Sequence, residues 1–214
     1  MVKLYVEGGG DAHSLRTACR KGFAIFLENA GLRGHLPRVV ACGSRRDAYE
    51  SFRTACENGE DAFLLVDSET AVADCHQDGQ TKDGTPWRHL AERQEDQWRK
   101  PEMAEDWQCH LMVQCMEGWL LADRDTLKAF FGQEFNDHAL PGTATVESID
   151  KNEIFMSLKK ATDKCRTKGR YDKGKHSFII LESIDPIRVM ESCPWCKRFV
   201  EELKHRMNAR EASR

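Results

Sequence analysis

The sequence predicts an α/β protein with a mainly parallel, four-stranded sheet flanked by helices. The chain has 214 residues, 40% hydrophobic and 31% charged, enough for one domain with an extension. Its short apolar runs are continuous and do not alternate with polar residues, which is typical of strands buried on both faces. Segments with helical spacing separate the first three runs, so the order favours strand–helix–strand units.

Each apolar run is short enough for one strand and too short for a core helix. In a parallel sheet, successive strands of this kind are joined by right-handed crossovers. The predicted strands cover residues 2–6, 38–42, 62–66 and 111–115.

Two helices are predicted between the first three strands. Over residues 12–30, apolar side chains recur every three or four positions, and Gly31 is a suitable helix end. The second helix is expected to begin at Ser44, with Asp47 three residues later in a capping-box-like arrangement, and to end near Gly59.

After the third strand the chain changes character. Residues 70–106 are polar, contain several glycines and prolines, and are predicted to form an insertion or lid with one helix over 86–98. We therefore expect a sheet domain over 1–125 and a mostly helical extension over 126–214, packed on the same domain. Further helices are predicted at 116–122, 152–164 and 194–207, and a short last strand at 177–181.

Acidic residues stand where predicted strands end. Glu7 follows the first strand, and Asp67 and Glu69 follow the third. Because the carboxyl ends of parallel strands line one crevice, these side chains should meet if the two strands are neighbours. Asp67 and Glu69 are two residues apart and would point the same way if the strand stayed extended.

Carboxylates that lie close together need a proton or a cation to offset the repulsion between their negative charges. Two carboxylates about 4 Å apart repel by roughly 4 kcal/mol at an effective dielectric constant of 20, so either a proton or a cation must be shared. No His or Cys ligands accompany the acids, which favours Mg²⁺ or Mn²⁺. Glu117, after the fourth strand, is either a further metal ligand or an ordinary first-turn helix acid.

Other residues near these strand ends are candidates for binding a phosphate or a nucleic acid. Gly8 and Gly9 either let a phosphate approach the backbone or simply form a tight turn. A phosphodiester-cleaving site also needs cations to stabilise developing charge, although surface cations are common. The candidate cations are Arg45, Arg46, Lys173 and Lys175.

The composition predicts the cellular compartment of the protein. The odd number of cysteines, nine, and the absence of a signal peptide predict a reducing cytoplasm and no disulfide framework. No apolar stretch approaches the roughly 20 residues of a membrane span. Cys193 and Cys196 lack the second ligand pair of a zinc site and are expected to pack the last helix.

The strand-end motifs resemble the Rossmann-like TOPRIM domain of topoisomerases, primases and overcoming-lysogenization-defect nucleases. Val6-Glu7-Gly8 resembles the strand that opens TOPRIM, and Val66-Asp67-Ser68-Glu69 resembles its Asp-x-Asp strand with Glu in the second place. Over nearly its whole length the chain resembles more closely a bacterial TOPRIM-like family, through motifs such as Met116-Glu117-x-Trp119 and Tyr171-x-Lys173-Gly174. Members of that family are often encoded beside an AAA- or ABC-type ATPase in antiphage defence loci.

This resemblance implies a Mg²⁺-dependent nuclease acting on DNA or RNA, with an ATPase as partner. It implies acid–base work for Glu7 and metal binding by Asp67 and Glu69. Lys173 would complete the catalytic group by stabilising charge. A homo-oligomer is possible, and no membrane partner is expected.

Two other functions stay open. A non-catalytic TOPRIM-like subunit that regulates an ATPase is favoured by the Glu69 replacement and by the lack of a strong basic stripe. A phosphate-transferring enzyme would use Asp67 as nucleophile, but no matching motif follows it.

Overall fold

The computed structural model describes residues 1–72, 85–142 and 145–211. Its centre is a sheet of four parallel strands in the order β2-β1-β3-β4. The predicted α/β class is therefore confirmed, and the first and third strands are neighbours. The strands are β1 (Lys3–Gly9), β2 (Arg38–Gly43), β3 (Ala62–Asp67) and β4 (Cys109–Met112).

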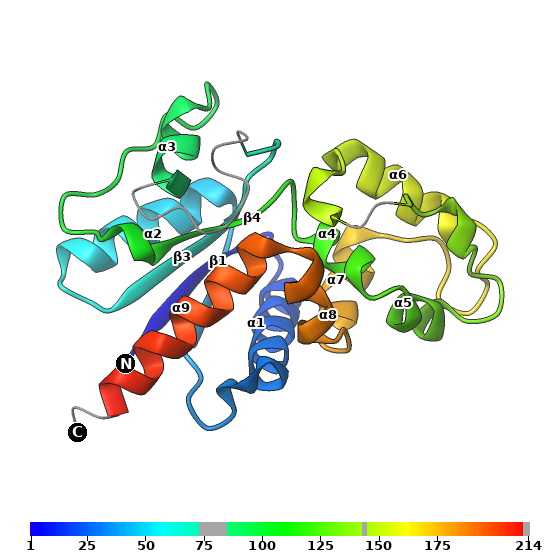
Figure 1. Ribbon diagram of the computed structural model, residues 1–214, viewed down its shortest axis with the longest axis horizontal. Helices are drawn as coiled ribbons and strands as arrows, with labels where there is room; N and C mark the ends of the chain where they lie inside the picture. Colours follow the sequence, from blue (N-terminus) through cyan, green and yellow to red (C-terminus); the bar gives the residue numbers. More distant parts are fainter. Residues whose placement is uncertain (73–84, 143–144, 212–214) are drawn as a thin grey trace.

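Helices cover both faces of the sheet (Figure 1). The helices α1 (His13–Leu27) and α9 (Pro194–Glu211) share one apolar core with one set of strand side chains. The helices α2 (Arg45–Glu57) and α3 (Thr85–Glu92) cover the opposite set. Burial on both faces explains why the strand sequences are continuously apolar.

The residues predicted to mark the ends of the first two helices, Ser44 and Gly31, lie at helix ends in the structure. Ser44 caps α2, and its side chain accepts a hydrogen bond from the Asp47 N–H group. The π-helical turn Glu28–Leu32 follows α1, and Gly31 within it has φ 99°, a conformation that favours glycine.

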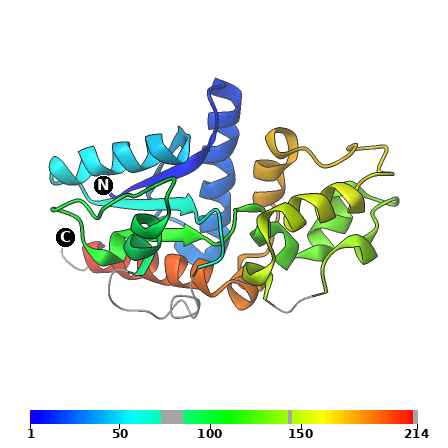
Figure 2. The ribbon, with the colours of Figure 1, turned by 90° about the horizontal axis from the view of Figure 1, so that it is seen from above.

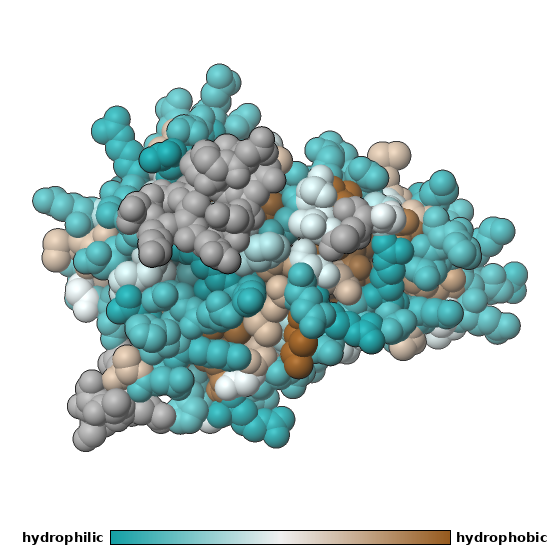
Figure 3. All heavy atoms as spheres, viewed as in Figure 1, coloured by the Kyte–Doolittle hydropathy of each residue, from teal (hydrophilic) through white to brown (hydrophobic). Residues whose placement is uncertain are grey.

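A lobe of helices lies beyond the carboxyl ends of the strands (Figures 1 and 2). Within it α7 packs against α1, which brings the lobe to the end of β1. Hydrophilic side chains dominate the surface of this lobe in Figure 3. Its helices are α4 (Glu117–Ala122), α5 (Arg124–Phe131), α6 (Lys151–Ala161), α7 (Lys173–Leu181) and α8 (Pro186–Ser192).

Short 3₁₀ turns lie between the longer elements. In the described part of the chain, Asp137–Ala139 and Val146–Ser148 (η5) belong to the lobe, and Asp106–Gln108 precedes β4. None of the helices in the described ranges is long and apolar enough to cross a membrane.

The structure corrects several predicted boundaries. The predicted strand over 177–181 is wrong, because these residues form the second half of α7. Asp172 begins that helix by accepting a hydrogen bond from the Lys175 N–H group, a signal that the apolar run alone hides. The fourth strand begins two residues before the predicted run, at Cys109. In the insertion, α3 ends at Glu92, and residues 73–84 lie outside the described part of the chain.

Candidate metal centre

The acidic residues of the first and third strands lie together at the carboxyl edge of the sheet. One carboxylate oxygen each from Glu7, Asp67 and Glu69 lie within 4.8 Å of one another. Among the described residues no other group of this kind was found. Asp67 is only 2% exposed, so the group lies largely below the surface.

Glu69 reaches this group through a turn after β3, and not because side chains alternate along an extended strand. The strand β3 ends at Asp67, and Glu69 has φ 67°, in the left-handed region. Its N–H group donates to the carbonyl oxygen of Gln114, which itself has φ 62°. A sharp turn therefore directs Glu69 back to Asp67, and the expectation of an extended strand there is wrong. Such backbone strain is typical of functional sites.

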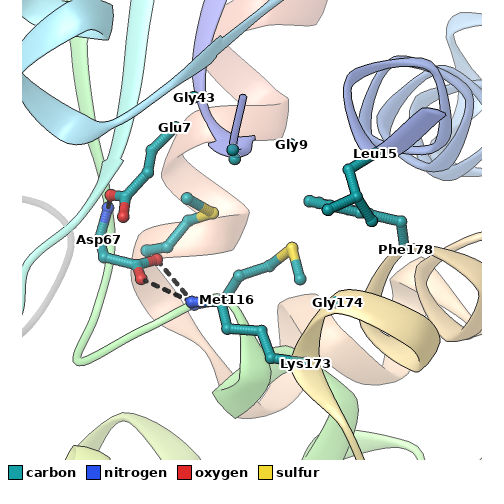
Figure 4. Close-up of a pocket in the computed structure, with 12 residues that line it drawn as sticks. Glu7, Gly9, Leu15, Gly43, Asp67, Met116, Lys173, Gly174 and Phe178 are labelled. Carbon is teal, nitrogen blue, oxygen red and sulfur yellow. Dashed lines mark hydrogen bonds and ion pairs between the residues drawn. The ribbon is translucent and has the colours of Figure 1, made fainter. Parts of the chain in front are cut away.

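Glu7 and Asp67 are joined through the backbone of β3. The Asp67 N–H group donates to Glu7 Oε2 at 3.0 Å, and the Met116 N–H group donates to Asp67 Oδ1 at 2.8 Å (Figure 4). Burial, followed by the charge of Asp67, raises the pKa of Glu7 to about 8. Burial also raises the pKa of Asp67 to about 6, although Lys173 opposes the shift. At neutral pH the pair therefore holds a proton or needs a cation.

Three basic side chains surround the carboxylates. Lys151 Nζ lies 2.6 Å from Glu69 Oε1 and 3.7 Å from Asp67 Oδ2. Lys173 Nζ lies 3.9 Å from Asp67 Oδ2, and Arg45 Nε lies 3.6 Å from Glu7 Oε2. A metal ion held by all three acids would therefore share Glu69 with Lys151 or displace it.

A cavity of about 290 Å³ opens directly beside Glu7 and Asp67. In Figure 4 these carboxylates form one wall, and the apolar side chains of Leu15 and Phe178 form the opposite wall. Lys173 reaches in from α7. Most of its lining is apolar, and its volume leaves room for a small ligand group beside Glu7 and Asp67.

The glycines of β1 form another part of the cavity wall. Gly8 has φ 133° and Gly9 has φ 85°. A Cβ atom on Gly9 would lie 2.7 Å from the Arg16 Cα atom, so close packing against α1 already requires glycine there. The same absence of side chains leaves the backbone accessible from the cavity, so the structural and phosphate-binding explanations are compatible.

Glu117 is completely buried and lies outside the three-carboxylate group. Its Oε1 atom accepts hydrogen bonds from Ser177 Oγ at 3.0 Å and from the Tyr171 hydroxyl at 3.3 Å. Its Oε2 atom lies 3.5 Å from Lys173 Nζ. Burial alone would lower the pKa of Lys173, but Glu117 and Asp67 raise it above the ordinary value. Glu117 therefore keeps Lys173 charged and holds it beside Asp67.

The remaining predicted cations are Arg45, which lies beside Glu7 but is held there by other contacts, and Arg46 and Lys175, which lie away from the cavity. Arg45 makes two hydrogen bonds to Asp96, at 2.6 and 2.8 Å, and donates to the Asp67 carbonyl oxygen. Its guanidinium group is thus occupied in fixing the end of β3. Arg46 and Lys175 are exposed and do not line the cavity. Lys175 Nζ donates to the Lys168 carbonyl oxygen.

Sequence reasoning missed Lys151, Asp96, Tyr171 and Ser177. Lys151 begins α6, far along the chain from the strands, and only packing of the lobe brings it to Glu69. Tyr171 and Ser177 also reach the site through this packing. Cys193 and Cys196 are both buried and free, and pack within the apolar core, as predicted.

Comparison with known proteins places the chain in a family. Residues 6–204 match the family described as "Domain of unknown function (DUF4276)", and the chain belongs to this family. No characterised protein matches the chain significantly. No solved structure does so either.

Proposed function

We propose that this DUF4276 protein is a divalent-metal-dependent nuclease of the TOPRIM type that hydrolyses phosphodiester bonds in DNA or RNA. The observation that carries the proposal is the convergence of Glu7, Asp67 and Glu69 at the ends of adjacent parallel strands, beside a cavity. Burial is the main cause that raises the pKa values of Glu7 and Asp67, and a bound cation would stabilise their charged forms. Carboxylate oxygens alone suit Mg²⁺ or Mn²⁺.

Each part of the site has a role in this chemistry. A bound metal ion would neutralise phosphate charge and activate water. Glu7, Asp67 and Glu69 would hold it, and Glu7 is also the candidate for proton transfer. Lys173, held by Glu117 at the cavity, would donate to a phosphate oxygen as negative charge develops. The glycine wall leaves room for the phosphate to approach.

The cellular setting is proposed from the sequence resemblance alone. It favours an AAA- or ABC-type ATPase as partner and a role as effector in antiphage defence. A cytoplasmic location belongs to the same proposal, since nucleic acid substrates and such an ATPase occur there. The free cysteines of the described chain are consistent with a reducing compartment.

One observation favours the regulatory alternative, in which the chain binds an ATPase and cleaves nothing. Lys151 already contacts Glu69 at 2.6 Å and approaches Asp67, so an internal cation supplies part of the compensation that a metal would give. In that case the acids would fix the lobe to the sheet, and the cavity would have no catalytic role.

Replacement of Asp67 by Asn separates the two functions. The purified protein should bind Mg²⁺ or Mn²⁺ in calorimetric titrations and cleave plasmid DNA or total RNA, with or without the neighbouring ATPase. Asp67→Asn should abolish metal binding and lower cleavage by about a thousandfold, because several kcal/mol of charge stabilisation are lost.

Glu147→Gln is the matched control, since Glu147 is also a buried acid but lies outside the carboxylate group. It should bind metal and cleave like the wild type. An Asp67→Asn protein with full cleavage activity would remove the nuclease proposal. Copurification with the ATPase, without metal binding or cleavage by the wild type, would establish the regulatory function.

A further inference from the structure

A second hollow lies on the helical lobe, away from the carboxylates. It has a volume of about 500 Å³ and opens between the segment 139–141 and α6. Its lining combines an apolar floor with cations on the rim, and Glu153 is its one acidic residue. The lining includes Leu140, Pro141, Met156, Lys159, Lys160 and Arg170. We call this hollow the α6 groove.

The α6 groove belongs to the most basic part of the chain. Residues 159–175 contain eight basic and two acidic residues, whereas the rest of the chain carries a net charge of −9. The whole-chain charge of −3 hides this local excess of positive charge. All eight basic residues are exposed.

The cations of the groove are largely available. Within the described ranges, Lys159 and Lys160 form no ion pair, and Arg170 has only a long contact to Asp163, with Nε and Oδ1 3.6 Å apart. Surface ion pairs of this kind are weak. The lining of the groove therefore presents a net positive charge to solvent.

The helix α6 connects this groove to the acidic cavity. Lys151, at its first position, contacts Glu69, and Lys160 lies near its last position. The nine-residue separation corresponds to about 13 Å at roughly 1.5 Å per residue. That length spans about four successive phosphates of a DNA strand, at roughly 3.4 Å per phosphate along the axis. One strand can therefore reach both places.

We infer that the α6 groove binds the sugar–phosphate backbone of a nucleic acid a few nucleotides from the phosphate at the acidic cavity. The inference rests on the proposed nuclease function and names its substrate-binding surface. Lys159, Lys160 and Arg170 neutralise phosphates, while the exposed Met156 and the Leu140–Pro141 floor contact sugars or bases. Lys173, from the same basic segment, lies at the acidic cavity.

Charge-neutral variants of the groove test this inference. The triple variant Lys159→Gln, Lys160→Gln and Arg170→Gln is compared with the wild type by fluorescence anisotropy, using a short labelled DNA duplex and a single-stranded RNA. Ca²⁺ replaces Mg²⁺ to slow cleavage. Binding of at least one probe should weaken about tenfold or more near 0.1 M salt, and the salt dependence should fall by about two to three released ions.

Two further variants test whether a loss of probe binding is specific to the groove. The control, Arg20→Gln with Arg33→Gln and Arg38→Gln, removes the same charge from exposed positions on α1 and near the start of β2, and should bind like the wild type. Asp67→Asn should lose cleavage but keep probe binding, which separates failure of the metal site from failure of the groove. The triple groove variant should keep its Mg²⁺ affinity.

Three results would overturn the inference while leaving the metal site intact. They are unchanged probe binding by the triple variant, no binding of either probe by the wild type, and equal competition by polyglutamate at matched charge. The last result would mean that the groove attracts acidic proteins as well as it attracts nucleic acid.

Discussion

Two regions of the molecule hold a glutamate whose pKa is raised to about 8, yet their surroundings differ. Glu7, at the sheet edge, faces a second acid, two basic residues and a cavity. Glu147, in η5, lies beneath the start of α9, where the N–H groups of Trp195 and Cys196 donate to it. Within the described chain Glu147 has no ion pair and lines neither the cavity nor the α6 groove.

The comparison shows that a raised pKa identifies a buried acid and not its purpose. Burial is the main cause of the shift in both cases. Glu147 uses its carboxyl group to satisfy the free N–H groups of a helix start, which is a structural task. At Glu7 the added features are a neighbouring carboxyl and an open cavity, and these are the features that indicate metal binding.

Within this comparison, the largest expected effect comes from removing Lys173, a cation that faces Glu7 and has no counterpart beside Glu147. Lys173→Met should lower the turnover of metal-dependent cleavage by about a hundredfold, the usual effect of losing one donor to developing charge. Metal affinity should change little or rise, since Lys173 is a competing cation near Asp67. Steady-state cleavage rates and Mg²⁺ titrations measure the two quantities.

A double variant distinguishes chemistry from folding. Lys173→Met alone leaves the buried Glu117 without its cation, which destabilises the fold. Lys173→Met with Glu117→Gln restores the charge balance and should recover stability but not turnover. Recovery of cleavage by the double variant would show that Lys173 has only a structural role.

A moderate effect should appear in the pH dependence of stability. The pKa of Glu147 is about 8 in the folded state, above its ordinary 4.5, so the folded state binds more protons between these values. The stabilisation of the folded state by this pKa shift is complete below pH 4.5 and is lost as pH rises through 8. Glu7, at about 8, and Asp67, at about 6, behave in the same direction when no metal is bound.

Added metal should distinguish the stability of the two regions, because only Glu7 and Asp67 are candidate ligands. Without metal, the unfolding free energy should fall by on the order of 1–3 kcal/mol per carboxyl from pH 5 to pH 9. Mg²⁺ should recover the part due to Glu7 and Asp67, and Glu147→Gln should remove the remainder. Urea unfolding at both pH values, with and without Mg²⁺, measures this. A wild-type profile that Mg²⁺ leaves unchanged would count against the metal centre.

The sequence predicted the sheet better than the lobe for a physical reason. Continuous apolar runs and helix caps such as Ser44 are local signals, and they place Glu7 and Asp67 at strand ends before any contact is known. Crossover rules fix the handedness of these connections and not the strand order, so the meeting of Glu7 and Asp67 was predicted only on the condition that β1 and β3 are neighbours. The structure meets this condition.

Long-range packing was not predictable in this way. Lys151 and Tyr171 reach the acids only because the lobe folds against the end of the sheet, and no local pattern marks them. Residues 177–181 combine apolar and helical features, and the cap at Asp172 decides between strand and helix. Glu69 arrives through a left-handed turn that a strand pattern cannot show.

The smallest expected effect concerns that turn. Glu69→Gly should relieve the strain of a non-glycine residue at φ 67° and change the unfolding free energy by about 1 kcal/mol or less, because loss of the Lys151 ion pair offsets the gain. It should still weaken Mg²⁺ binding by about tenfold, at roughly 1.4 kcal/mol for one lost ligand.

Gln97→Gly is the matched control, since Gln97 is exposed, has φ 51° and lies outside the carboxylate group. It should relieve the same kind of strain with no change in metal affinity. If Glu69→Gly binds Mg²⁺ as tightly as Gln97→Gly does, then Glu69 is held by Lys151 alone, and the metal would rest on Glu7 and Asp67. A drop confined to Glu69→Gly would instead show that the left-handed turn serves to direct a third ligand to the ion.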